Sequence, residues 1–334
     1  MVKAPLYPLR FQPIYKNTIW GGNKILDLKN LEPNDEKIGE SWEISGVQND
    51  ISVVSDGYLK GTSLNDLIQK YKEIFVGETV YQRYGNQFPL LFKFIDAHDD
   101  LSVQVHPDDE MARKHRQSNG KTEFWYVIDA KEGSSLYAGL KKNCTAEELR
   151  AAVEQGEVCE LLNKEEVVAG DAFFLPAGRV HAIGAGLLIA EIQQTSDATY
   201  RLFDYNRVDT NGKPRELHLD KALESIDYKV YRNYKTIYNK NRMCKPIQLK
   251  ECGYFTINLI NADTFVKFDY NGLDSFVAFM CVEGSAVFTS QRKFNGKINK
   301  GETILFPACD LPVALIPEND KVKLLEVYVK EHFL

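Results

Sequence analysis

The stretch Gly170-Asp-Ala-Phe-Phe-Leu-Pro-Ala177 decides the fold, because the chain contains it twice. Gly301-Glu-Thr-Ile-Leu-Phe-Pro-Ala308 matches it position for position. A repeated stretch of this kind indicates two copies of one structural unit. We therefore expect two related domains, which the length of 334 residues also favours.

The distance from an upstream turn to this repeat differs between the two copies. The turn glycine is Gly133 in the first copy and Gly284 in the second, and it lies 37 and 17 residues before the repeat. Thr145-Ala-Glu-Glu148 is a capping box, which predicts a helix running to about Leu162. This helix with its flanks accounts for the difference of 20 residues, so only the first copy should carry it.

The glycine turn followed by Gly-(Asp/Glu) and Pro-Ala resembles the two conserved motifs of the cupins, which are small antiparallel barrels. The resemblance implies a mainly β chain of two cupin barrels (double-stranded β-helix, or jelly-roll), with helical insertions in the first. We assign residues 1–235 to a catalytic cupin domain with these insertions. Residues 236–334 are assigned to a C-terminal cupin-like domain without metal ligands.

Short runs rich in Val, Ile, Phe and Tyr predict the strands. They lie at Ser41–Ser45, Leu90–Ile95, Phe124–Ile128, Ala172–Leu175, Leu187–Ile192, Phe255–Ile260 and Leu324–Val329. Pro107-Asp-Asp-Glu110 opens a short helix, and His115 at its basic end should face solvent. Ser63 is the expected N-cap of another helix, whose apolar stripe consists of Leu64, Leu67, Ile68, Tyr71 and Phe75.

The composition narrows the class of protein. Hydrophobic residues make up 44% and charged residues 26%, which is typical of a well-packed globular chain. The net charge of −6 and the lack of a basic stretch argue against a nucleic-acid partner. No apolar run approaches membrane-spanning length, and six scattered cysteines are typical of a reducing compartment, so we expect a cytoplasmic protein without membrane contact. The oligomeric state stays open, with a monomer favoured.

A polar row on one predicted strand indicates a possible metal site. Ser102, Gln104 and His106 share one face of Leu101–His106, because side chains alternate along a strand. When Gln-x-His occurs without other candidate ligands, its histidine is more often a buried residue that hydrogen-bonds to its neighbours than a metal ligand. The repeat favours a ligand, because His181 lies five residues after Pro176 whereas the matching position in the second copy is a proline, Pro312.

Gln104, His106, Glu123 and His181 together offer an amide oxygen, two imidazole nitrogens and a carboxylate. Such donors suit Zn²⁺ and tolerate Mn²⁺, Co²⁺ or Fe²⁺. The other histidines, including His218, show no partner pattern, and we treat them as ordinary.

Four stretches resemble type I mannose-6-phosphate isomerases in their short bacterial form. They are Leu90–Ile95, Leu101-Ser-Val-Gln-Val-His-Pro-Asp108, Lys121-Thr-Glu123 and Pro176-Ala-Gly-Arg-Val-His181, and the resemblance runs from about Tyr7 to Arg207. It implies one Zn²⁺ per chain, held by the four residues above. It also implies reversible exchange of mannose 6-phosphate and fructose 6-phosphate through an enediol(ate). The large helical domain of the longer eukaryotic enzymes has no counterpart here.

This exchange moves a proton between two carbons, so it needs an electrophile, a base and an anchor for the phosphate. Glu191, which matches a family glutamate, is the expected base or proton shuttle; a salt-bridged carboxylate is the alternative. Arg201 matches a family arginine and should bind phosphate or enediolate, unless it forms a salt bridge to Asp197 or Asp204. Lys121 should donate to a sugar oxygen, and it competes with a metal-bound water for the proton transfers.

Arg179 and Lys93 are further expected phosphate partners, with a solvated surface charge as the alternative for each. The run Gly39-Glu-Ser-Trp-Glu43 should border the pocket. Two other functions remain open at this point: another sugar-phosphate isomerase or epimerase, and a non-catalytic cupin that binds sugar.

Overall fold

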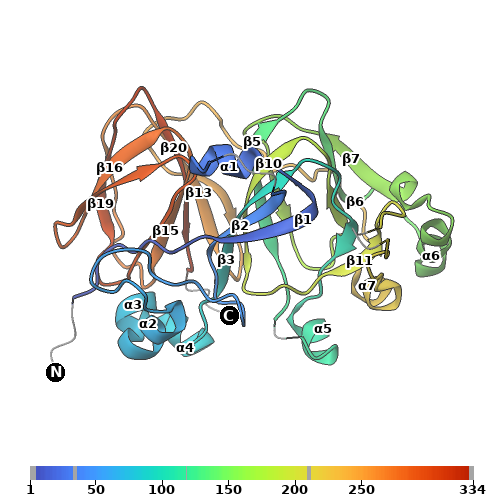
Figure 1. Ribbon diagram of the computed structural model, residues 1–334, viewed down its shortest axis with the longest axis horizontal. Helices are drawn as coiled ribbons and strands as arrows, with labels where there is room; N and C mark the ends of the chain where they lie inside the picture. The colour runs from blue at the N-terminus through green and yellow to red at the C-terminus, as the bar shows by residue number, and fades with distance from the viewer. Residues whose placement is uncertain (1–4, 33–35, 118, 209–211, 331–334) are drawn as a thin grey trace.

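The computed structural model describes residues 5–32, 36–117, 119–208 and 212–330 (Figure 1). Two β barrels lie side by side, the first mainly green and the second orange to red, and short helices cover their lower ends. This mainly β architecture with two barrels confirms the predicted fold class. No helix among the described residues is long and apolar enough to span a membrane.

The first barrel consists of two antiparallel sheets. One sheet has the strand order β1-β2-β3-β10-β5-β8, and the other has the order β11-β4-β9-β6-β7. The strands of the six-stranded sheet are β1 (Ile14–Gly22), β2 (Ile38–Ile44), β3 (Leu90–Ala97), β10 (Leu187–Gln194), β5 (Glu123–Ala130) and β8 (Ala172–Leu175). Those of the five-stranded sheet are β11 (Tyr200–Phe203), β4 (Val103–Val105), β9 (His181–Ile183), β6 (Ser135–Leu140) and β7 (Leu162–Glu166).

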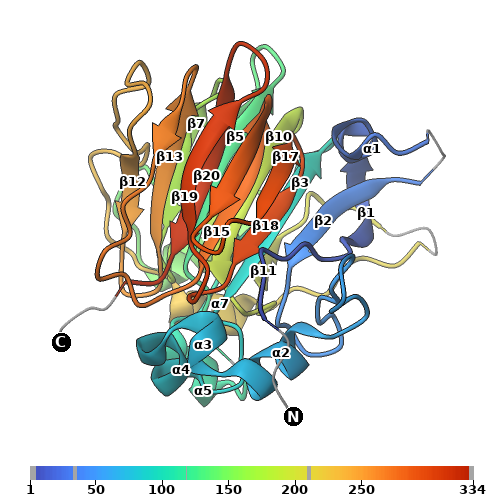
Figure 2. The same ribbon diagram turned by 90° about the vertical axis from the view of Figure 1, so that its left-hand side faces the viewer.

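The second barrel repeats this plan with fewer strands. Its sheets have the orders β12-β13-β20-β15-β18 and β14-β19-β16-β17, and Figure 2 views this barrel from the side opposite the first barrel. The strands are β12 (Ile247–Glu251), β13 (Thr256–Ala262), β20 (Val322–Tyr328), β15 (Val277–Glu283), β18 (Thr303–Phe306), β14 (Val266–Lys267), β19 (Pro312–Pro317), β16 (Ser285–Ser290) and β17 (Asn295–Asn299).

The sequence repeat takes the same place in both barrels. Gly170 and Gly301 have φ angles of +85° and +83°, a backbone conformation that only glycine adopts readily. Each glycine precedes an edge strand, β8 or β18, that pairs with β5 or β15. The next strand begins at His181 in the first barrel and at Pro312 in the second, so the position predicted for a metal ligand is structurally equivalent.

The helical insertion of the first barrel is confirmed, although its helix is shorter than predicted. α6 (Ala146–Glu154) begins at the capping box of Thr145, and a 3₁₀ turn (Val158–Leu161) follows it between β6 and β7. The helix ends early because Gly156 has a φ of +76°, which breaks the helical path. In the described part of the second barrel, β17 follows β16 without a helix.

The predicted helix from Leu64 to Phe75 is interrupted. Ser63 caps α2 (Leu64–Tyr71) as expected, and its Oγ accepts a hydrogen bond of 3.1 Å from the Asp66 N–H. Lys72 has a φ of +52°, and the chain restarts as α3 (Glu73–Val76) and then α4 (Glu78–Tyr84). The break could not be predicted from the sequence, because the apolar residues keep their helical spacing on both sides of Lys72. The remaining helices are α1 (Lys24–Lys29), α5 (Asp109–Lys114) and α7 (Leu219–Ser225).

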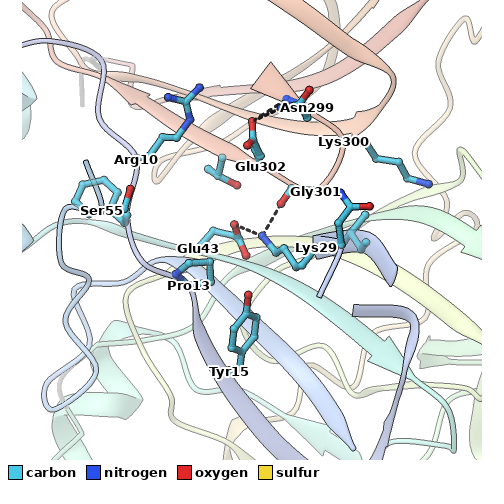
Figure 3. Close-up of a pocket in the computed structure, with 14 residues that line it drawn as sticks. Arg10, Pro13, Tyr15, Lys29, Glu43, Ser55, Asn299, Lys300, Gly301 and Glu302 are labelled. Carbon is cyan, nitrogen blue, oxygen red and sulfur yellow. Dashed lines mark hydrogen bonds and ion pairs between the residues drawn. The ribbon is translucent and has the colours of Figure 1, made fainter. Parts of the chain in front are cut away.

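Polar and backbone contacts join the two barrels. Leu9 pairs with Leu305 of β18. Lys29 at the end of α1 donates to Glu43 at 2.6 Å and to the carbonyl oxygen of Gly301, across a cavity of about 400 Å³ (Figure 3). This cavity lies between the barrels and is lined by neither Glu123 nor His181.

Candidate metal centre and active site

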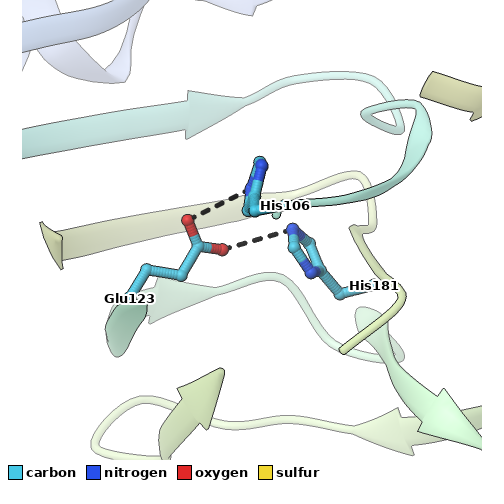
Figure 4. Close-up of side chains that lie close together, drawn as sticks. All are labelled: His106, Glu123 and His181. Atoms are coloured by element: carbon cyan, nitrogen blue, oxygen red, sulfur yellow. Dashed lines mark ion pairs between the residues drawn. The ribbon is translucent and has the colours of Figure 1, made fainter. Parts of the chain in front are cut away.

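Three side chains of the first barrel converge on one point (Figure 4). His106 follows β4, Glu123 begins β5 and His181 begins β9, so three strands bring them together. Each oxygen of the Glu123 carboxylate faces one of the two rings, with Oε2 3.4 Å from His106 Nε2 and Oε1 3.2 Å from His181 Nε2. The possible ligand atoms all lie within 4.8 Å of one another, and all three residues are buried.

Backbone carbonyls set which ring nitrogens carry protons. Nδ1 of His106 lies 2.8 Å from the Ala198 oxygen, and Nδ1 of His181 lies 2.8 Å from the Arg179 oxygen. A carbonyl oxygen can only accept, so each Nδ1 donates and each Nε2 turns a lone pair toward Glu123. Metal-binding histidines are commonly oriented by such a contact.

The electrostatics keep these groups in the protonation states that bind metals. Burial lowers the pKa of His106 to about 3, and the nearby Lys121 ammonium adds to the effect. Burial also lowers the pKa of His181. Burial opposes the charge on Glu123, but Lys121 and the two imidazoles hold the pKa of this carboxyl well below its usual range. The group is therefore two neutral imidazoles and one carboxylate.

Both Glu123 oxygens are buried, and neither accepts a hydrogen bond from the residues that the structure describes. Two nearby side chains supplement the group. Lys121 Nζ lies 3.1 Å from Glu123 Oε2 and 3.1 Å from His106 Nε2. Gln104 Nε2 lies 3.3 Å from His181 Nε2, while its Oε1 faces Ser102 Oγ at 3.5 Å. A half-turn of the Gln104 carboxamide exchanges these two atoms and turns the oxygen toward the histidines.

A cavity of about 390 Å³ opens beside this centre. Both sheets of the first barrel line it, so it is the mouth of the barrel. It is lined by five of the site residues predicted from the sequence: Gln104, Lys121, Glu191, Arg201 and Lys93. Its other polar or aromatic lining residues are Thr18, Trp20, Glu40, Trp42, Ser102, Trp125, Asp197, Thr199, Arg215 and His218.

Glu191 stands in the middle of β10 and is only 3% exposed. Trp125 Nε1 donates to its Oε1 at 2.8 Å, and Lys93 Nζ lies 3.5 Å from its Oε2. Burial, together with repulsion from Glu123, raises the pKa of Glu191 to about 7. Lys93 also pairs with Glu40 at 3.3 Å, so one ammonium is shared by two carboxylates.

Arg201 on β11 is held by neutral partners. Its Nε donates to Ser102 Oγ at 3.2 Å and its Nη1 to the Glu216 carbonyl oxygen at 2.8 Å. Among the described residues, the ion pairs of Asp204 are with Arg207 and Arg215, so the salt bridge from Arg201 to Asp204, the alternative to anion binding, does not form. Burial lowers the pKa of Arg201, and repulsion from Arg215 adds to this, which is typical of a cluster that attracts anions.

Two cavity residues were missed at the level of sequence. Arg215 reaches the cavity while its Nε donates to Asp204 Oδ2 at 2.7 Å. His218, which we treated as ordinary, lines the same cavity and its Nδ1 accepts from the Arg201 backbone N–H at 3.4 Å. Both lie beyond β11 in a segment without periodicity. The only usable signal was the run of arginines at 201, 207 and 215.

Arg179 and His115 differ in position from what the sequence suggested. Arg179 Nη1 donates to the Phe174 carbonyl oxygen at 2.9 Å, and its guanidinium lies over the Tyr231 ring, so the side chain points away from the cavity lining. The prediction that His115 faces solvent is wrong. Its side chain is 9% exposed, because its ring packs edge-on against Tyr200 of β11, whose hydroxyl lies 2.7 Å from Nδ1.

The same positions in the second barrel carry different chemistry. Strand pairing places Val277 where the first barrel has Glu123, and Pro312 where it has His181. Glu326 takes the place of Glu191: it faces Phe279 and Asn258, as Glu191 faces Trp125 and Lys93. The second barrel thus keeps one buried carboxyl and has no ligand at two of the three metal positions.

Known proteins resemble this chain in both sequence and structure. Residues 8–149 match the family model described as phosphomannose isomerase type I, catalytic domain. Mannose-6-phosphate isomerase ManA of Bacillus subtilis is 38% identical over 302 residues, which cover 90% of this chain and 93% of that protein. A mannose-6-phosphate isomerase of Streptococcus mutans is 42% identical over 219 residues, or 66% of this chain and 67% of that protein. The crystal structure of a mannose 6-phosphate isomerase from Bacillus subtilis matches with a TM-score of 0.84 and 31% identity, over 98% of this chain and 99% of that one.

Proposed function

We propose that this chain, which belongs to the phosphomannose isomerase type I family, interconverts mannose 6-phosphate and fructose 6-phosphate with one bound Zn²⁺ and through an enediol(ate) intermediate. The family predicted from the sequence motifs is confirmed, and the chain is an isomerase. The observation that carries the rest is the buried His–Glu–His group beside a cavity that also holds Glu191 and Arg201.

The residues present fit a zinc ion. Two neutral imidazoles and a carboxylate are a common zinc ligand set. Neither buried oxygen of Glu123 accepts a hydrogen bond from the described residues, and the one cation beside them is the Lys121 ammonium, 3.1 Å from Oε2. His106, Glu123 and His181 would hold the ion, with the Gln104 oxygen as a fourth ligand. When bound, zinc would polarise the oxygens of the sugar and stabilise negative charge on them.

Glu191 is the proposed carrier of the proton between C1 and C2. A pKa of about 7 lets one carboxyl both accept and return a proton near neutral pH, which a reversible isomerisation requires. Trp125 and Lys93 hold the two oxygens of Glu191 and so fix the direction of the carboxyl. Lys121, which is almost fully buried beside Glu123, is the proposed donor to a sugar oxygen.

Arg201 and Arg215 are the proposed anchors of the phosphate. Both line the cavity, and the single carboxylate of Asp204 does not neutralise the three arginines around it. A guanidinium binds phosphate through parallel hydrogen bonds, which fixes orientation as well as charge. Lys93 is bound by Glu40 and Glu191, so its proposed role is to orient Glu191 near the reacting carbons. The position of Arg179 offers no support for a phosphate contact.

A coupled assay of mannose 6-phosphate conversion, run together with a zinc determination on the same sample, tests this proposal. We expect turnover that disappears on chelation and returns with Zn²⁺. Turnover on a different sugar phosphate alone would favour another isomerase or epimerase. Stoichiometric zinc without turnover on either hexose phosphate would refute the proposed reaction and favour a sugar-binding cupin.

A further inference from the structure

The segment Gly120–Glu123 carries both a proposed metal ligand and the proposed donor Lys121, and it has little secondary structure before Glu123. Its first three backbone N–H groups are nevertheless all bound. The N–H of Gly120 donates to Asp109 Oδ1 at 2.9 Å, and that of Thr122 donates to Gln194 Oε1 at 2.8 Å. The N–H of Lys121 donates to the Pro107 carbonyl oxygen at 2.9 Å. Side chains from α5 and β10 therefore hold both neighbours of Lys121.

These two side chains also bind each other, and they reach the second barrel. Gln194 Nε2 donates to Asp109 Oδ1 at 3.1 Å. The hydroxyl of Tyr254, in the turn between β12 and β13, donates to Asp109 Oδ2 at 2.8 Å. The carboxylate of Asp109 thus accepts from three donors that come from three different parts of the chain.

The close approach of the two segments requires glycine at position 120. A Cβ on Gly120 would lie 2.5 Å from the Asp108 carbonyl carbon and 2.6 Å from the Asp109 nitrogen. Both atoms belong to the backbone at the start of α5, so they cannot move aside as a flexible side chain would. The packing of α5 on this segment is therefore tight, and a displacement of Asp109 must displace Gly120 and its neighbours.

Tyr254 is itself fixed. The guanidinium of Arg83 lies over its ring at 5.6 Å, and an Arg83 Nη1–H donates to the Gly253 carbonyl oxygen next to it. Arg83 belongs to α4, which packs at the end of the second barrel, where the N–H groups of Glu78 and Thr79 donate to Asp274. The hydroxyl of Tyr254 therefore reaches Asp109 from a rigid support.

We propose that Tyr254, Asp109 and Gln194 form a positioning network through which the second barrel holds Lys121 and Glu123 in register with His106 and His181. None of the three contacts the reacting groups in this proposal; they act through the backbone of residues 120–122. The second barrel thus contributes to the geometry of a site for which it supplies no ligand. The proposal rests on the metal site of the proposed function but not on its reaction: a wild type that binds neither zinc nor cobalt would contradict that metal site, whereas turnover reports only on the reaction.

The test compares Tyr254→Phe with a matched control, Tyr270→Phe. Both variants remove one tyrosine hydroxyl of the second barrel that donates to a carboxyl group, Asp109 in one case and Glu326 in the other. The zinc-loaded protein is mixed with a chromophoric chelator to measure zinc release, and the cobalt-substituted protein gives a visible absorption spectrum. The values of kcat, KM and Tm are also measured for each variant.

We expect Tyr254→Phe to release zinc about 10-fold faster and to lower kcat by a similar factor, with KM and Tm close to those of the control. Its cobalt spectrum should shift, whereas that of Tyr270→Phe should match the wild type. Asp109→Asn should have the larger effect, up to about 100-fold in zinc release, because an amide NH₂ would face one of the three donors. Equal zinc release and equal cobalt spectra in Tyr254→Phe, Tyr270→Phe and the wild type would overturn the proposal, whether or not the protein turns over mannose 6-phosphate.

Discussion

Replacing Arg201 by alanine gives the sharpest test of how this site binds its substrate. Two of the five N–H groups of the guanidinium are bound, one to Ser102 and one to the Glu216 backbone. Three remain for an anion in the cavity that Arg201 lines. The substitution removes this fork without touching His106, Glu123 or His181.

The expected loss follows from the number of bonds. A hydrogen bond to a charged group contributes about 1.5–3 kcal/mol, so losing a fork of two costs at least about 3 kcal/mol. That corresponds to about a 150-fold fall in kcat/KM. Arg201→Lys retains the charge but presents no fork, and we expect it to recover about tenfold of this loss.

The assay measures kcat/KM and the zinc content after dialysis for each variant. Arg150→Ala is the matched control, because Arg150 is a half-exposed arginine on α6 that pairs with Asp220 and does not line the cavity. Arg201→Ala should retain zinc while its turnover falls, and Arg150→Ala should change neither. If Arg201→Ala lost zinc together with turnover, the role of Arg201 would be to hold Ser102 and Gln104 in place, and the assignment as a phosphate anchor would be wrong.

Four further predictions concern His181, Glu191 (two of them) and Ser63. His181→Ala should lose zinc and turnover together, as measured by metal analysis after dialysis; a variant that keeps stoichiometric zinc would contradict the ligand assignment. Glu191→Gln should lower kcat by about 10²–10⁴-fold and keep its zinc, whereas Glu326→Gln should change neither, and equal losses in the two variants would argue against a catalytic role for Glu191. Because burial raises the pKa of Glu191 from 4.5 to about 7, ionising it costs folding free energy that appears as the pH rises from about 4.5 to 7. We therefore expect the free energy of unfolding, measured by urea titration of the metal-free proteins, to fall more between pH 5 and 8 in the wild type than in Glu191→Gln, by up to about 3 kcal/mol. Parallel pH profiles would contradict the raised pKa. Ser63→Ala should lose about 1 kcal/mol of stability with unchanged kcat, since Ser63 only caps α2, and an unchanged urea midpoint would mean that the cap contributes nothing.

The two-barrel architecture could be predicted from the sequence because it depends on local signals that occur twice. A glycine with positive φ followed by a short apolar strand and Pro-Ala has the same meaning at Gly170 and at Gly301. The alternation of side chains along Leu101–His106 likewise placed Gln104 and His106 on one face before any tertiary contact was known.

The parts that were missed depend on tertiary contacts that leave no local trace. The break at Lys72 interrupts an apolar stripe that continues on both sides of it. His115 is polar and stands at a helix end, and its side chain is largely covered because Tyr200 of β11 packs against it. Arg215 and His218 reach the cavity by the path of a segment whose residues show no period. Their roles became visible only when the chain closed around the barrel mouth.

The comparison of the two barrels shows which feature the chemistry depends on. A buried carboxyl in the middle of the strand is common to both, since Glu326 occupies the register of Glu191. Glu326 is bound by Asn258 and Tyr270, and its pKa is raised by burial, so it is a satisfied acid in a closed core. Glu191 instead lies beside a cavity and a charged centre, because Glu123 and His181 stand where the second barrel has Val277 and Pro312. The carboxyl alone therefore does not make a site; what distinguishes the first barrel from the second is Glu123 and His181, each at the start of a strand and one in each sheet.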